Sequence, residues 1–172
     1  IVSTGGQVTG ICGSDNLAVI GIGFADRVEV YNKSLELSQT ISVSNSSVAV
    51  SPDGTYLFVG NSNAVNSNDS YGCVYVYKNS NGTFVLDQTI YNPVAVQGMN
   101  FGVSIDITEG NDSLIISATG TNGTLDTTFD KNLMTIDGNI TRIKGTELYT
   151  GAVYVYYKKY NRYVYTQELV DP

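Results

Sequence analysis

Hydrophobic and polar positions alternate in short runs along the chain. In Val74-Tyr-Val-Tyr77 and Val153-Tyr-Val-Tyr156, valine and tyrosine alternate, which places each residue type on one face of an extended strand. The runs are rich in β-branched and aromatic residues, and turn sequences such as Ser51-Pro-Asp-Gly54 lie between them. No part of the sequence has sustained helical periodicity. The pattern therefore predicts an all-β protein.

Four such runs recur in the same order three times. The third and fourth runs of each unit resemble one another most and fall at Arg27–Tyr31 and Leu37–Ile41, Cys73–Tyr77 and Leu86–Ile90, and Ala152–Tyr156 and Tyr165–Leu169. The first two runs are Val8–Cys12 and Leu17–Ile22, Val48–Ser51 and Tyr56–Gly60, and Gly102–Ile107 and Leu114–Ala118. Two independent markers give the same register, namely Tyr31, Tyr77 and Tyr156, and Gln39, Gln88 and Gln167. The third unit is longer because it contains an insertion.

Four antiparallel strands in a repeat of 40 to 50 residues are typical of a β-propeller blade. We therefore expect one domain, residues 1–172, with blades at about 6–42, 46–91 and 99–170 and an insertion at 119–150. Three blades do not close a ring, since four is the usual minimum. The chain is then part of a longer propeller, or several copies assemble, or the sheets form a sandwich-like domain. The first two solutions require contacts beyond this chain.

The third unit contains Asn100-Phe-Gly-Val-Ser-Ile105, then Leu114-Ile-Ile-Ser-Ala-Thr-Gly120, then Gly151-Ala-Val-Tyr-Val-Tyr156. This series resembles the FG-GAP repeat, the blade of integrin-type propellers. The second unit keeps Val48-Ala-Val-Ser-Pro-Asp-Gly54 but lacks the Phe-Gly pair, and Gly-Ala-Pro does not occur in the sequence. The resemblance implies propeller blades and, in some of them, bound calcium.

Calcium in integrin-type blades lies in an Asp-rich turn between the first two strands. The matching turn here is 106–113, so the resemblance makes Asp106, Thr108 and Asp112 candidate calcium ligands. The Asp-x-Asp-x-Asp-Gly spacing is absent, and a solvated turn is the alternative interpretation. We expect no other cofactor.

The composition favours a secreted, cell-surface or virion protein. Asn, Ser and Thr supply 16, 16 and 17 of the 172 residues, whereas charged residues make up only 15%. The net charge of −7 argues against binding to a phosphate backbone. No apolar run approaches the roughly 20 residues of a membrane-spanning helix.

Seven Asn-x-Ser/Thr sequons mark candidate N-glycosylation sites, and most fall in expected turns or loops. They are Asn32, Asn45, Asn68, Asn81, Asn111, Asn122 and Asn139. The alternative is that Asn, Ser and Thr simply accumulate in turns.

Catalytic motifs are scarce. The sequence has no histidine, which removes the commonest general base and a common metal ligand. No glycine-rich phosphate loop is present, although a pair of carboxylates for glycoside cleavage is compatible with the sequence. Cys12 and Cys73 fall at opposite ends of their expected strands, so we expect no disulfide between them. The chain is predicted not to be an enzyme.

Two segments are candidate recognition elements. The insertion 119–150 carries two sequons and contains Leu133–Ile136 and Thr141–Ile143, which are able to pair as a hairpin. It is either a recognition or assembly element or a glycan-bearing decoration. The last hairpin holds a tyrosine cluster, for which packing between blades is the expected role: Tyr154, Tyr156, Tyr157, Tyr160, Tyr163 and Tyr165.

The sequence thus predicts an extracellular, non-enzymatic structural protein. It would be a subunit of a surface assembly such as a filament, an appendage, or a virion or tail component. Its partners would be copies of itself or other subunits, possible N-linked glycans would decorate it, and nucleic acid and membrane spans are not expected. The alternative is an adhesion or ligand-binding propeller module that acts through the loop 119–150.

Overall fold

The structure, a computed structural model, describes residues 7–15, 19–44, 47–65, 71–93, 99–119 and 151–170. In these ranges the chain is all-β, as predicted. The strands are β1 (Val8–Gly13), β2 (Ile20–Phe24), β3 (Arg27–Tyr31), β4 (Leu37–Ser42), β5 (Ser47–Val50), β6 (Tyr56–Val65), β7 (Tyr71–Ser80), β8 (Thr83–Tyr91), β9 (Asn100–Ile107), β10 (Ser113–Thr119), β11 (Ala152–Lys159) and β12 (Arg162–Val170).

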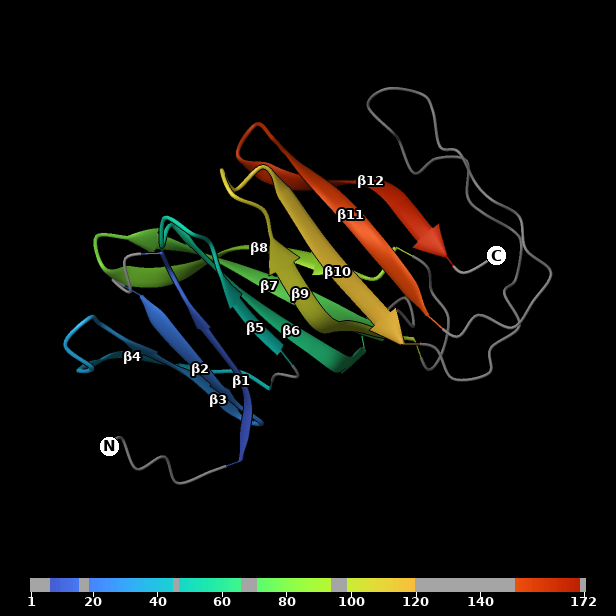
Figure 1. The fold of residues 1–172 in the computed structure, drawn as a ribbon. Helices are drawn as coiled ribbons and strands as arrows, with labels where there is room; N and C mark the ends of the chain where they lie inside the picture. The colour runs from blue at the N-terminus through green and yellow to red at the C-terminus, as the bar shows by residue number, and fades with distance from the viewer. Residues whose placement is uncertain are drawn as a thin grey trace.

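The strands form three antiparallel four-stranded units, β1–β4, β5–β8 and β9–β12, which we call blades 1, 2 and 3 (Figure 1). Within each blade, consecutive strands are hydrogen-bonded neighbours. A single parallel pair, Gly72 with Phe101, joins blades 2 and 3 into one eight-stranded sheet. The first strands of the blades, β1, β5 and β9, lie next to one another. This is the arrangement of propeller blades, and the sandwich-like alternative is not observed.

The predicted strands are all present, but the hairpin of blade 2 is longer than expected. β6 continues to Val65 and β7 begins at Tyr71, beyond the expected ends Gly60 and Cys73. The strand pairing in this extension is irregular, because the register shifts between Asn61 and Val65. The sequence pattern therefore identified the core of the hairpin and missed its solvent-facing end.

Two hydrophobic clusters lie between the blades and not within them. Between blades 1 and 2, Val28 and Val30 pack with Leu57 and Val59, all nearly inaccessible to solvent. Between blades 2 and 3, the larger cluster consists of Ala49, Tyr56, Phe58, Val74, Val76, Ile90, Met99, Phe101, Leu114, Ile116, Ala118, Ala152, Tyr154, Tyr156 and Tyr163. Alternate residues of β6 thus face opposite neighbours, so blade 2 is covered on both sides.

The Phe-Gly pair of blade 3 has a structural reason. Phe101 is completely buried, and Gly102 has φ +87°, a conformation that residues with a Cβ rarely adopt. Gly102 also lies against Gly60 of blade 2, where a Cβ on either glycine would meet backbone atoms. Ser47 Oγ donates a 2.7 Å hydrogen bond to the Gly102 carbonyl. This close approach brings blades 2 and 3 together.

Two further expectations concern cysteine and the membrane. Cys12 and Cys73 are both free thiols in this structure. The part of the chain that the structure describes contains no helix long and apolar enough to cross a membrane.

Candidate functional site

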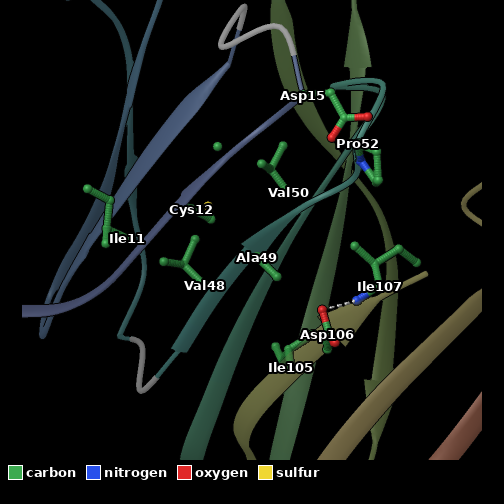
Figure 2. Close-up of a pocket in the computed structure, with 11 residues that line it drawn as sticks. Ile11, Cys12, Asp15, Val48, Ala49, Val50, Pro52, Ile105, Asp106 and Ile107 are labelled. Carbon is green, nitrogen blue, oxygen red and sulfur yellow. Dashed lines mark hydrogen bonds between the residues drawn. The ribbon is translucent and has the colours of Figure 1, made fainter. Parts of the chain in front are cut away.

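The strands β1, β5 and β9 line a cavity of about 310 Å³ (Figure 2). In a propeller the first strand of each blade lies nearest the central axis, and the strands that line this cavity are the first strands of the three blades. Its apolar lining includes Ile11, Val48 and Ile105, and two carboxylates, Asp15 and Asp106, lie at its edge.

The chemistry available in this cavity is limited. Burial raises the pKa of the Cys12 thiol to about 12, so the thiolate required of a nucleophile is not formed near neutral pH. Asp106 Oδ1 accepts a 2.9 Å hydrogen bond from the Ile107 amide. Among the described residues, no group of three or more His, Cys, Asp or Glu side chains is placed to hold a metal ion. The chemistry that the structure shows in this cavity is thus one thiol with a raised pKa and one hydrogen-bonded carboxylate.

Of the candidate calcium ligands, Thr108 and Asp112 lie in the turn between β9 and β10, whereas Asp106 lies within β9, next to its last residue. Thr108 Oγ1 is already engaged, because it accepts from the Ser113 amide at 3.1 Å and donates to the Ser113 carbonyl at 3.3 Å. Asp106 and Asp112 are exposed. These hydrogen bonds are those of a self-contained turn, and calcium binding at these residues stays a prediction.

A second polar cluster joins the turns of blades 2 and 3 and was not predicted. Asp53 accepts hydrogen bonds from Ser51 Oγ at 2.8 Å, from the Thr55 amide at 2.8 Å and from Thr55 Oγ1 at 2.7 Å. The Asn111 side chain of blade 3 also bonds Asp53. Desolvation of the carboxylate favours a higher pKa, but these hydrogen bonds outweigh it and lower the pKa of Asp53 to about 2. The carboxylate therefore stabilises both its own turn and the contact with blade 3.

Paired hydrogen bonds between outer strands connect each blade to the next. Gln39 Nε2 donates to the Phe84 carbonyl at 2.9 Å, and the Phe84 amide donates to Gln39 Oε1 at 2.8 Å. Gln88 makes the same pair with Tyr163, at 2.8 Å and 3.0 Å. We call this paired contact the glutamine clasp. It satisfies both backbone groups of a residue whose side chain is buried between the blades.

Each clasp glutamine occupies the same place in its blade. Gln39 pairs with Val30 and Gln88 with Val76, and in both blades the register shifts at the next pair. The glutamines that mark the repeat in the sequence are therefore interface residues, a role that the sequence pattern did not predict. The recurring spacing was the available signal, but it does not reveal which backbone the amide meets.

The tyrosine cluster of the last hairpin packs mainly between blades, as expected. Tyr163 makes edge contacts with Tyr56 and Phe58 of blade 2, with ring centroids 5.9 Å and 5.4 Å apart. Its hydroxyl donates a 3.1 Å hydrogen bond to the Asn111 carbonyl. Tyr154 and Tyr156 are buried in the same cluster, whereas Tyr157 and Tyr160 are exposed. The cluster is thus mostly core.

Three of the seven sequons lie within the described residues. Asn81 is exposed in a turn, as a glycan-bearing residue requires. Asn32 Nδ2 donates to Glu36 Oε2 at 2.8 Å on the surface. Asn111 is only 7% exposed and bonds Asp53, which disfavours an oligosaccharide there. It is the least exposed of these three asparagines, and glycosylation stays a prediction for all three.

Several predictions fall outside the described residues. They are the sequons Asn45, Asn68, Asn122 and Asn139, and nearly all of the insertion 119–150, including its expected hairpin. The strands on either side of the insertion pair directly, with Ala118 opposite Ala152. The described residues of blade 3 thus form four paired strands on both sides of the insertion.

Comparison with solved structures places the fold among β-propellers. A chain of hydrazine synthase from Kuenenia stuttgartiensis is similar over 96% of this chain and 37% of its own length, with a TM-score of 0.60 and 15% identity. The WD40 domain of Toxoplasma gondii coronin is similar over 99% and 36%, with a TM-score of 0.60 and 5% identity. The β-propeller domain of Cps50 (Swd1) from Myceliophteria thermophila is similar over 100% and 40%, with a TM-score of 0.55 and 11% identity.

These identities are too low to indicate a shared activity, but the shared fold is a β-propeller type. The chain spans between 36% and 40% of the length of these three structures. No protein-family model matches the chain. No curated protein matches it either.

Proposed function

We propose that the protein is a non-enzymatic structural component of a larger propeller assembly. The observation that carries this proposal is the arrangement of three blades that pack through repeated interfaces without closing a ring. An assembly of this kind requires blade faces and strand edges that pack against neighbouring blades. The described residues supply both. The low reactivity of Cys12 and the Asp53 cluster, which joins the turns of blades 2 and 3, support a structural role over a catalytic one.

We further propose that the assembly is extracellular and that its blades are of the FG-GAP type. The sequence rich in Asn, Ser and Thr and the exposed sequon at Asn81 support an extracellular, glycosylated protein. The buried Phe101 and Gly102, whose φ of +87° favours glycine, support the FG-GAP assignment, because they give its two-residue motif a packing role.

The mass of the protein isolated from its source tests this proposal, measured natively and after enzymatic removal of N-glycans. We expect a native particle much larger than 18.5 kDa and a loss of mass on deglycosylation. A glycan-free monomer of 18.5 kDa would contradict both the assembly and the glycosylated location.

Adhesion through the insertion is the second candidate. It is supported by the direct pairing of Ala118 with Ala152, which holds the two strands that flank the insertion together. Deletion of residues 121–148 should leave the β-sheet circular dichroism spectrum unchanged and abolish binding to a glycan or protein array. Binding that survives the deletion would assign recognition to another surface.

A further inference from the structure

The two interfaces between blades use the same parts in the same places. In each, the earlier blade contributes a glutamine clasp and an apolar face, and the later blade contributes a large buried side chain from its outer strand. Phe84 and Tyr163 are this side chain in blades 2 and 3, and each lies four residues before the next glutamine position. The interface is therefore a repeated unit of construction.

On the face that points away from blade 2, blade 3 repeats the features that the earlier blade contributes to each interface, a clasp glutamine and an apolar face. Gln167 pairs with Val155 immediately before a register shift, as Gln88 pairs with Val76. Thr166 Oγ1 donates to the Val155 carbonyl at 2.8 Å, as Ser38 Oγ donates to the Val30 carbonyl at 2.9 Å. Blade 3 therefore has the local backbone geometry that positions a clasp glutamine in the other blades. The Gln167 side chain itself is exposed.

The apolar face beside Gln167 is also present but only partly covered. Ile115, Val153 and Val155 are half-buried, whereas their equivalents in blade 2, Phe58, Val74 and Val76, are completely buried by blade 3. From this continuity the geometry points to a fourth blade, following blade 3 in the same propeller, as the partner that covers this face. Gln167 would form a glutamine clasp with the backbone N–H and C=O of one residue in the outer strand of that fourth blade.

Blade 1 of a second copy does not fit this position. Leu35 stands four residues before Gln39, but it has φ +61° and its amide already donates to the Asn32 carbonyl at 2.9 Å. That amide is therefore not available to Gln167. The side chain of Leu35 is also 59% exposed on a turn and not directed into an interface core.

The face of blade 1 raises a second obstacle to a copy. Glu29 occupies the position of Tyr75 and Tyr154, opposite Ile22 as they are opposite Val59 and Ile116. It pairs with Arg27 at 2.8 Å and accepts from Tyr31 at 2.6 Å. Pressing this charged group against the apolar Val153 and Val155 would cost its hydration. The partner blade must instead offer apolar and tyrosine side chains, as blades 2 and 3 do.

The test extends the full chain with a blade of the required kind, a second copy of residues 43–93 after Pro172. We expect a monomer in which the amide of the appended Phe84 is protected from hydrogen exchange. Gln167→Ala should then accelerate exchange of that amide about five- to tenfold and lower the melting temperature by about 2–4 °C. In the unextended chain, the same substitution should change neither stability nor exchange of the corresponding amides.

The matched control is Gln88→Ala, which should destabilise the extended and unextended chains alike. An unprotected Phe84 amide in the appended blade, or protection that ignores Gln167→Ala, overturns the inference. Self-association of the unextended chain that Gln167→Ala abolishes also overturns it, in favour of a second copy. If the first extension does not fold, a second extension made from residues 94–119 joined to 150–170 presents Tyr163 in place of Phe84. An amide of the appended Tyr163 that is not protected from hydrogen exchange would equally overturn the inference.

The inference rests on the proposed function only in requiring blades beyond these three. A glycan-free monomeric native protein would contradict the proposed assembly without changing the result of the extension experiment. Failure of the extension would leave the native mass unaffected. The two outcomes are therefore distinguishable.

Discussion

At the scale of single residues, Asp53 links a local turn to the acid stability of the molecule. Its pKa is about 2 in the folded protein against an ordinary 3.8, so the unfolded chain binds the proton more tightly. The stabilisation is complete above pH 4 and is lost as the pH falls from about 4 to 2. Because the carboxylate is exposed, solvent screening limits this contribution to about 1 kcal/mol.

Asp53→Asn should therefore reduce the acid-induced loss of stability. We expect the difference between the urea unfolding free energies of the native protein and the variant to shrink between pH 5 and pH 2. Thr55 and Ser51 retain an acceptor in the variant amide, which keeps the turn shape. An unchanged difference across this pH range would show that Asp53 does not contribute to acid sensitivity.

Gly60 is a residue at which the backbones of blades 2 and 3 approach closely. A Cβ there would overlap the Gly102 carbonyl and Ser47 Oγ. Gly60→Ala should thus destabilise the protein by about 3 kcal/mol or prevent blades 2 and 3 from joining. Gly82→Ala is the control, because Gly82 has open space around it and only its φ of +88° opposes a side chain, which costs about 1 kcal/mol. Chemical denaturation of the two variants should separate them clearly, and equal losses would contradict the close approach.

At the scale of elements, the glutamine clasps join strands that are not hydrogen-bonded neighbours in a sheet. Gln88→Ala should leave the amide and carbonyl of Tyr163 without partners beside a buried ring and lower stability by about 2 kcal/mol. Native-state hydrogen exchange should show faster exchange at Tyr163, while the Phe84 amide, held by Gln39, stays protected. Loss of protection at both amides would indicate a global effect instead of a local clasp.

Strands were predictable from the sequence because alternation in runs such as Val74–Tyr77 reflects burial on two faces of one element. The contacts that join elements were less accessible. The bond between Asn111 and Asp53 connects turns of different blades, and the sequon at Asn111 gave the opposite expectation of an exposed residue. Likewise, the equal spacing of Gln39, Gln88 and Gln167 revealed a repeat, but the partner of each glutamine depends on how the next blade is placed.

At the scale of the whole molecule, the three blades form a short linear array in which only blade 2 has a neighbour on both faces among the described residues. In such an array stability is close to a sum of the blades and their interfaces, so the ends open before the middle. Blade 2 also shares a sheet with blade 3 through Gly72 and Phe101, whereas blade 1 is joined to it through the smaller cluster and one clasp.

We therefore expect hydrogen exchange in low urea to release the amides of blade 1 first, those of blade 3 next and those of blade 2 last. Val28→Ala, which leaves a cavity between blades 1 and 2, should accelerate exchange in blade 1 selectively, because the other interface is untouched. Ile116→Ala removes the same kind of contact between blades 2 and 3 and should accelerate exchange in blade 3 instead. Identical protection in all three blades, falling together in both variants, would mean that the array unfolds as one cooperative unit, and the interfaces would then be as strong as the blades that they join.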